Sequence, residues 1–397
     1  MMALPMAFAL ADDDVTLTVL WFNDANESDV FMDTISDYLA DHPNVKIDLQ
    51  VVAFDGYEQQ LKMMIAGDNA PDLARLTTAL MPTFSSSLEP LENRVDVAEV
   101  EAAFAPAMLA YARNSEGKLV AYPTEATANG MLVNITAFEK AGIDVRELSK
   151  TWTWADWEEA AKKVIAASDT VKYGLAVDFT PHRLSTILYQ FGGRLLKEDL
   201  SAMNFSNEGT INALTWFKRM HDEGLIPQSV WMGSENPAEL FQAGLVAGHI
   251  GGSWNINTYA NITDFEWAAV NCPTGAIRSS VPGGKFIASF KDAAHKEEAA
   301  ALMAAFSDAK HNAKYCLGTF NLTSRVDVEI EYPTATESFK VFAEDLAVTP
   351  TYTAEEQNTP IVGKMGSNIK EQVVQMLLGA QTVEECCAEI DRLASEM

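Results

Sequence analysis

Basic residues are scarce in this chain of 397 residues. Lysine and arginine together number 28, against 56 aspartates and glutamates, which gives a formal net charge of -28 at neutral pH. A surface this acidic repels phosphate backbones and anionic lipid headgroups, so binding to nucleic acid or to a membrane surface is disfavoured. An acidic ligand would need a local basic pocket of its own.

Cysteines and long apolar runs are also rare. Cys272, Cys316, Cys386 and Cys387 are too few and too irregularly spaced for a disulfide framework or a zinc site. Past the N-terminus, nothing approaches the roughly 18 uninterrupted apolar residues that a membrane-spanning helix needs. We therefore expect buried free thiols and no membrane span.

The signatures of catalysis are missing. Gly283-Gly284-Lys285 is followed by Phe286, so the Ser or Thr with which a P-loop holds Mg²⁺ is absent. No His-Glu-x-x-His or Gly-x-Ser-x-Gly motif occurs, and no Pro-Cys-x-x-Cys follows His295 as in a zinc deaminase. Among 56 acidic residues some pair always fits a glycosidase, so such a pair carries no weight. The sequence predicts no enzyme and no cofactor; a carbohydrate-active enzyme or lyase on another α/β fold is the alternative.

The N-terminus has features of an export signal. Met1 to Ala11 is a short, mostly apolar run that ends in Ala9-Leu10-Ala11, and three aspartates follow. Small residues with this spacing are typical of a signal-peptidase site, although the basic region that opens such signals is absent. We interpret residues 1–11 as a signal-peptide remnant cleaved near Ala11, which predicts a periplasmic protein. A disordered apolar N-terminus is the alternative, and without a nearby cysteine no lipid anchor is expected.

The length and the element order favour two α/β lobes, since one core seldom serves so many residues. Periodicity and turn residues predict strands at 15–21 and 45–54 and helices from about 31 to 42 and from 57 to 67. Capping-box spacing predicts helices that start after Thr153 and Thr382. Helix-rich segments are expected near 211–223, 295–316, 337–346 and 361–378. Alternating strands and helices imply a parallel sheet, and the lack of a linker implies several crossings between the lobes.

A series of short motifs runs in order along the chain: Ala70-Pro71-Asp72-Leu73, Gly117 to Pro123, Thr151 to Trp154, Phe241 to Gly244, Gly251-Gly252-Ser253-Trp254 and Gly379 to Glu384. Each motif is weak alone, because Pro-Asp and Gly-Gly pairs are common turn chemistry. Their shared order and spacing resembles the family 1 extracellular solute-binding proteins of ABC importers, the group that includes the maltose-binding protein. The resemblance covers nearly the whole mature chain.

The resemblance implies an α/β, two-lobed periplasmic-binding-protein fold, type II-like, with a ligand cleft between the lobes and a multi-segment hinge. It places residues 12–124 with 285–326 in an N-terminal lobe and 125–284 with 327–397 in a C-terminal lobe. The implied partners are a small carbohydrate and the membrane permease subunits of an ABC transporter, and the protein is expected to be a monomer.

A sugar site needs an aromatic platform for C–H faces and polar side chains for hydroxyls. Trp254 is the main candidate for the platform, where the family carries a stacking aromatic; a core tryptophan is the alternative. Asn23 and Asp24 serve equally well as a helix cap and turn. Candidates at strand ends are Trp21, Asn23, Asp24, Arg75, Thr77 and Thr78. Candidates near the crossings and on the last long helix are Glu125, Asn129, His182, Arg183, Tyr189, Gly252, Ser253, Gly283, Gly284, Arg325, Lys364 and Ser367.

The charge of the ligand is the main point that the sequence leaves open. Arg75, His182, Arg183 and Arg325 would favour a uronate, a sugar acid or glycerol phosphate if they converged. We expect a neutral mono- or oligosaccharide, with the acidic ligand as the alternative.

Overall fold

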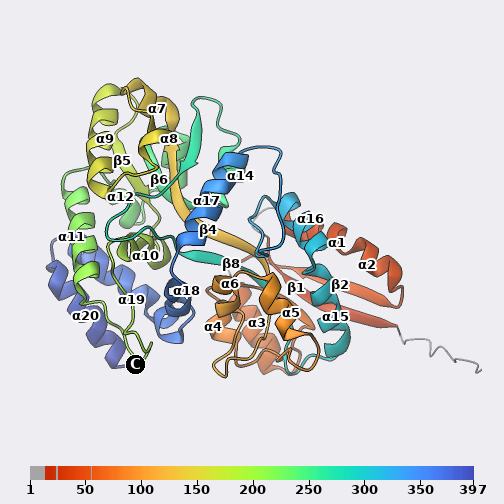
Figure 1. The fold of residues 1–397 in the computed structure, drawn as a ribbon. Helices are drawn as coiled ribbons and strands as arrows, with labels where there is room; N and C mark the ends of the chain where they lie inside the picture. The colour runs from red at the N-terminus through yellow and green to blue at the C-terminus, as the bar shows by residue number, and fades with distance from the viewer. Residues whose placement is uncertain (1–13, 24–25, 55) are drawn as a thin grey trace, which may run out of the picture.

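The computed structural model describes residues 14–23, 26–54 and 56–397. The expected signal remnant at 1–11 and the candidate Asp24 lie outside the described residues. Figure 1 shows two lobes joined at their middle, with strand β4 (Tyr122–Asn134) running from one into the other beside β8 (Pro282–Ala288). This is the α/β, two-lobed arrangement that the sequence predicts, while the exact lobe boundaries stay a prediction.

One mixed sheet runs through both lobes in the order β2-β1-β3-β8-β4-β6-β5, with β7 paired to β4 beside this path. β1 is parallel to both β2 and β3, as the alternation of strands and helices predicts. The other strands are β1 (Val15–Trp21), β2 (Val45–Val51), β3 (Leu73–Thr77), β5 (Tyr173–Val177), β6 (Val246–Gly252) and β7 (Trp267–Val270).

Strand β4 changes partners along its length. Its first part, up to Ala128, pairs with β8, and its second part, from Asn129, pairs with β6 and then also with β7. All 13 of its residues are buried. The same strand therefore lies at the centre of both lobes.

Helices cover both parts of this sheet (Figure 1). Around β1–β3 lie α1 (Glu27–Thr34), α2 (Ser36–Asp41), α3 (Tyr57–Ala66), α4 (Met81–Phe84), α5 (Val97–Ala103), α6 (Pro106–Tyr111), α15 (Lys296–Phe306) and α16 (Ala309–Thr319). The remaining helices are α7 (Ile135–Lys140), α8 (Val145–Leu148), α9 (Trp154–Ala167), α10 (Pro181–Gln190), α11 (Glu208–Asp222), α12 (Gln228–Trp231), α13 (Pro237–Gln242), α14 (Asn255–Tyr259), α17 (Thr336–Val348), α18 (Tyr352–Gln357), α19 (Pro360–Leu377) and α20 (Val383–Ser395). No helix in the described ranges combines the length and apolar character needed to cross a bilayer.

The predicted boundaries hold where local signals set them. β1 has its expected bounds, and both predicted capping boxes form, at the starts of α9 and α20. The helix expected from 31 to 42 is instead two helices, α1 and α2, because the chain turns at Ile35 and the Ser36 hydroxyl donates to the Asp33 carbonyl. The second strand ends at Val51 rather than at 54, since its neighbour β1 ends opposite it at Trp21.

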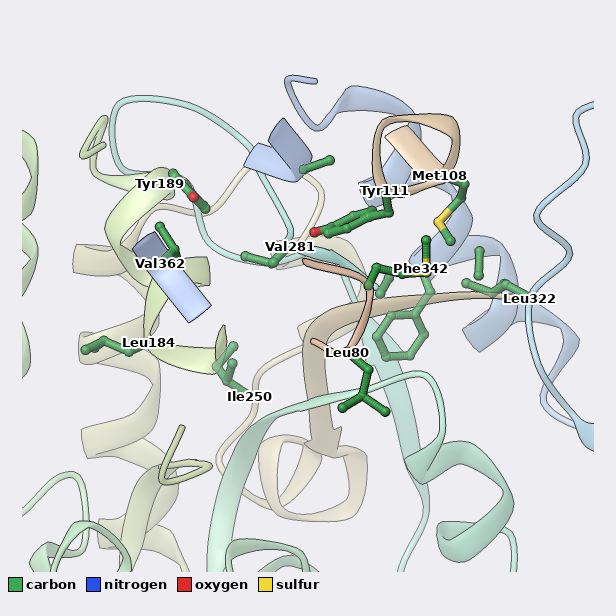
Figure 2. Close-up of a cluster of buried hydrophobic side chains, with 14 of the residues drawn as sticks. Leu80, Met108, Tyr111, Leu184, Tyr189, Ile250, Val281, Leu322, Phe342 and Val362 are labelled. Carbon is green, nitrogen blue, oxygen red and sulfur yellow. The ribbon is translucent and has the colours of Figure 1, made fainter. Parts of the chain in front are cut away.

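A buried apolar cluster joins segments that are far apart in the sequence. Figure 2 shows Leu80, which follows β3, and Tyr111 of α6 in one cluster with Leu184 of α10, Phe342 of α17 and Val362 of α19. The four cysteines are buried and free, as predicted. The interior is therefore held by packing across the sheet rather than by disulfides.

Candidate functional site

Four backbone segments meet at the middle of β4. Thr127 pairs with Gly283 of β8, and Asn129 pairs with Gly252 at the end of β6. The backbone N–H of Thr78, just past β3, donates to the carbonyl of Gly284 at 3.1 Å. A side chain at Gly284 would collide with the Glu125 carbonyl, so only glycine allows this approach. We call this place the crossing site, comprising Arg75, Thr78, Glu125, Thr127, Asn129, His182, Arg183, Gly252, Ser253, Trp254, Gly283, Gly284 and Lys285.

A buried ion pair lies on the β3 side of the crossing site. The guanidinium of Arg75 donates to Glu125 at 2.8 Å and to the Phe22 carbonyl at 2.8 Å, and neither charged side chain is exposed. Lys285 Nζ lies 3.4 Å from the same Glu125 oxygen, and the Asn321 amide donates to it at 3.3 Å. A carboxylate this deeply buried needs such partners, because an isolated charge is costly in the interior.

Trp254 lies where the sequence analysis expects a platform. It follows β6 directly and is only partly buried, and the guanidinium of Arg183 sits 4.2 Å from the centre of its ring. A side chain at Gly252 would overlap the indole, which therefore rests against bare backbone. The hydroxyl of Ser253 accepts from the N–H of Ala128 at 3.3 Å and ties this turn to β4. The platform role of Trp254 therefore stays a prediction, with a core tryptophan as its alternative.

A chain of hydrogen bonds fixes the guanidinium over the indole. Arg183 Nε donates to Asp178 at 3.2 Å, and the other Asp178 oxygen lies 2.7 Å from Nε2 of His249. Nδ1 of His249 lies 2.7 Å from the hydroxyl of Tyr259. Burial acts to raise the pKa of the Asp178 carboxyl, but His249 and Arg183 outweigh it and hold that pKa below its ordinary value. Asp178 is therefore an anion that positions Arg183.

Asn129 and His182 join the middle of β4 to the start of α10. The Asn129 amide nitrogen lies 2.9 Å from the His182 carbonyl, 3.1 Å from His182 Nδ1 and 2.9 Å from the Thr186 hydroxyl. Burial and the adjacent Arg183 lower the pKa of His182 to about 3. The imidazole is therefore neutral at physiological pH.

Three candidates at strand and helix ends have structural roles. Trp21 is fully buried and stacks on Phe31 with ring centres 4.6 Å apart, so it belongs to the core rather than to the cleft. Asn23 accepts from the N–H of Ser28 at 2.9 Å, which is the capping role weighed from the sequence. Thr77 likewise accepts from the N–H of Leu80 at 3.3 Å, within its own turn.

Other candidates lie apart from the crossing site. The buried hydroxyl of Tyr189 donates to Glu356 at 3.0 Å, within the α10–α18 contact. Arg325 forms two bonds to Asp327 and one to the Ser307 carbonyl, each at 2.8 Å. The last two, Lys364 and Ser367, are exposed on α19.

The basic residues therefore do not form one cationic pocket. Each of the three arginines of the set faces its own carboxylate, and His182 is neutral. Within residues 14–23, 26–54 and 56–397, no cluster of histidine, cysteine and acidic side chains is suited to hold a metal ion.

Four residues at or near the crossing site escaped the sequence analysis: Lys285, Asn321, Asp178 and His249. Asp178 follows β5 directly, so the rule that ligand groups gather at strand ends would have found it. Lys285 and Asn321 carry no such signal in the sequence. Lys285 reaches Glu125 only because β8 pairs with β4, and Asn321 lies 196 residues from Glu125 along the chain.

Comparison with known proteins decides the family. Residues 24–313 match the family model described as bacterial extracellular solute-binding protein. The chain belongs to this family. The resemblance drawn from the motif order is thereby confirmed. This solute-binding protein is 25% identical over 311 residues to a binding protein of Brucella abortus, covering 75% of the chain and 72% of that relative.

Solved structures agree with this fold over almost the whole length of the solute-binding protein. The ABC substrate-binding protein of Listeria monocytogenes, solved with cycloalternan, aligns with a TM-score of 0.77 at 21% identity, covering 97% of this chain and 99% of that one. The cyclic α-maltosyl-1,6-maltose binding protein of Arthrobacter globiformis aligns with a TM-score of 0.81 at 19% identity, covering 96% and 98%. These likenesses establish the two-lobed binding-protein fold.

Proposed function

We propose that this solute-binding protein captures a neutral carbohydrate in a cleft between its lobes and delivers it to the permease of an ABC importer. The observation that carries the proposal is the crossing site, where an indole and several hydrogen-bonding side chains gather as β4 passes between the lobes. Sugars bind to this combination, since the ring faces are apolar and the rims are hydroxyls. The Listeria and Arthrobacter relatives, which bind cyclic oligosaccharides, support the same ligand class.

The pairing of the cations at the crossing site with carboxylates supports a neutral ligand over a uronate or glycerol phosphate. Arg75 and Lys285 both face Glu125, and Arg183 faces Asp178. An anionic ligand would have to compete with these carboxylates, which are already close to the cations. A neutral hydroxyl competes with neither charge.

The proposed mechanism of ligand capture follows from the strands at the junction of the lobes, β4 and β8. On this proposal the lobes approach each other about β4 and β8 when ligand binds, and the protein acts as a monomeric receptor, not an enzyme. It would reach the periplasm with residues 1–11 removed near Ala11.

Titration calorimetry tests the proposal with maltose, maltotriose, cellobiose and galactose against galacturonate and glycerol 3-phosphate, at low and high salt. We expect a neutral saccharide to bind with an affinity that hardly changes with ionic strength, and chromatography to recover it intact. Tight, salt-sensitive binding of galacturonate would establish the acidic alternative. Cleavage of the saccharide would establish an enzyme, and binding of none of the neutral sugars would remove the neutral-sugar proposal.

A further inference from the structure

The indole of Trp254 is covered on both of its faces. A Cβ at Gly252 would collide with three consecutive carbons of the six-membered ring, Cη2, Cζ3 and Cε3, the last of them at 2.5 Å. A group beside the rim of a ring comes this close to two of its carbons at most, so the Gly252 backbone lies on a face of the indole. The guanidinium of Arg183 is 4.2 Å from the ring centre and, since that face is taken, it covers the opposite one. The part of Trp254 that stays exposed is therefore its rim.

A sugar cannot stack on Trp254 while both covers are in place. The C–H face of a sugar packs on the flat face of an aromatic ring, and the rim offers no such surface. The backbone at Gly252 cannot move aside alone, because Gly252 is paired with Asn129 in the sheet. The guanidinium of Arg183, in contrast, can leave the ring by rotation of its side chain.

The contacts of Arg183 are those of a side chain that can be displaced. Its Nε donates to one oxygen of Asp178 at 3.2 Å, and one terminal nitrogen lies 3.0 Å from Nδ1 of His182. Arg325, in comparison, forms three bonds of 2.8 Å, two of them to Asp327. The side chain of Arg183 is 17% exposed, so it borders solvent. The attraction between a cation and an aromatic ring is modest, and a stacked sugar face can replace it.

We propose that Arg183 is a guard residue that sets the ligand affinity of the crossing site: it covers the stacking face of Trp254 until a sugar displaces it. This inference rests on the proposed function and adds to it a side chain that opposes binding. The apparent affinity for sugar is then the intrinsic affinity of the uncovered site reduced by the fraction of molecules in which the face is free.

The sign of one mutational effect tests the proposal. Arg183→Ala uncovers the ring, so calorimetry with maltose, maltotriose, cellobiose and galactose should show an affinity about 2- to 30-fold higher than that of the wild type for whichever saccharide binds, because a cation–ring contact no longer has to be broken. An arginine that contacts the sugar would give the opposite sign. Arg183→Gln is the second variant, for use also if the alanine variant does not fold. Its amide can still donate to Asp178 but carries no planar cation, and it should raise the affinity too.

Two further variants serve as controls. Arg194→Ala is the matched one, because the guanidinium of Arg194 likewise lies over an aromatic ring, 4.0 Å from the centre of Tyr352, and pairs with Glu356. Its removal should leave the affinity unchanged. Trp254→Ala removes the ring itself, and adding Arg183→Ala to this variant should change the affinity no further. An effect of Arg183 that does not pass through the ring would persist in the double variant.

The outcomes separate this inference from the proposed function. If the wild type binds sugar and both Arg183 variants bind it equally or more weakly, the inference is overturned and the proposed function stands. A gain in affinity that persists without Trp254 would overturn the inference as well, because the ring would not be what Arg183 protects. Binding to Arg183→Ala but not to the wild type would support both proposals. If neither protein binds any of the four saccharides, the proposed function fails and the guard has no ligand to exclude.

Discussion

The guanidinium of Arg75 lies 2.8 Å from the carboxylate of Glu125, and both side chains are completely buried. Arg75 belongs to β3 and Glu125 to the first part of β4, so the pair ties β3 to the strand that crosses into the other lobe. Such a pair adds little net stability when intact, since desolvation offsets the attraction. Removing only one partner, in contrast, leaves an unpaired charge in the interior and lowers stability.

Glu125→Gln should lower the free energy of unfolding by about 3–5 kcal/mol, because Arg75 would keep its buried charge without its counter-ion. Urea unfolding followed by circular dichroism measures the loss. Glu159→Gln is the control, because it breaks the exposed pair with Lys163 and should cost less than about 0.5 kcal/mol. Equal small losses in both variants would show that the buried pair is not coupled to folding.

Trp254→Ala should weaken sugar binding by about 1–3 kcal/mol, which is about 5- to 150-fold, through loss of the stacking face. Its melting temperature should stay close to that of the wild type, since the indole is only partly buried. Trp231→Ala gives the contrast: this indole is fully buried and donates to the Val177 carbonyl, so its loss should cost about 3–5 kcal/mol of stability. A Trp254 variant that binds normally but melts early would assign Trp254 to the core.

Acid should destabilise the protein through His221. Burial lowers the pKa of this histidine to about 4, below its ordinary value of 6.5 in the unfolded chain. The unfolded state therefore binds the proton more readily, so this contribution to stability is complete above pH 6.5 and is lost as the pH falls toward 4. The slope is at most about 1.4 kcal/mol per pH unit. Unfolding of His221→Phe between pH 4 and 7 should show a flatter dependence than the wild type, and parallel curves would refute this assignment.

Saturating saccharide should bring the lobes together. Because β4 runs from one lobe into the other, rotation about it would change the distance between the lobes while its pairings with β8 and β6 stay intact. Small-angle scattering should record a smaller radius of gyration with ligand than without, at a mass that remains monomeric. An unchanged radius with a tightly bound sugar would argue against closure.

Local signals made much of the fold predictable. Thr153 with Asp156 and Thr382 with Glu385 are three residues apart, so each capping box can be read without knowledge of tertiary structure. Trp21 is an example of what local signals cannot predict. Its place at a strand end was correct, yet its contact with Phe31 depends on how α1 packs on the sheet.

The sequence predicted which types of residue lie at the candidate site, but not which side chains they bind. Arg75 and Arg183 were singled out as cations, but their carboxylate partners were not. Asp178 is only five residues from Arg183 in the sequence. Glu125 is distant in the sequence from Arg75 and reaches it only because β3, β8 and β4 pair in the sheet. The basic set in the sequence therefore indicated an acidic ligand more strongly than the paired arginines in the structure do.

The position of β8 also has a consequence for the order in which the molecule assembles. β8 lies between β3 and β4 in the sheet, yet it is synthesised after β5, β6 and β7. The sheet of the first lobe therefore cannot be completed until the strands of the second lobe have been synthesised. Until β8 is available, the edge of β3 that pairs with it stays unpaired. Pairings between such distant segments slow folding. We expect a late kinetic phase in refolding in which β8 inserts between β3 and β4. We also expect a single cooperative unfolding transition in which both lobes unfold together.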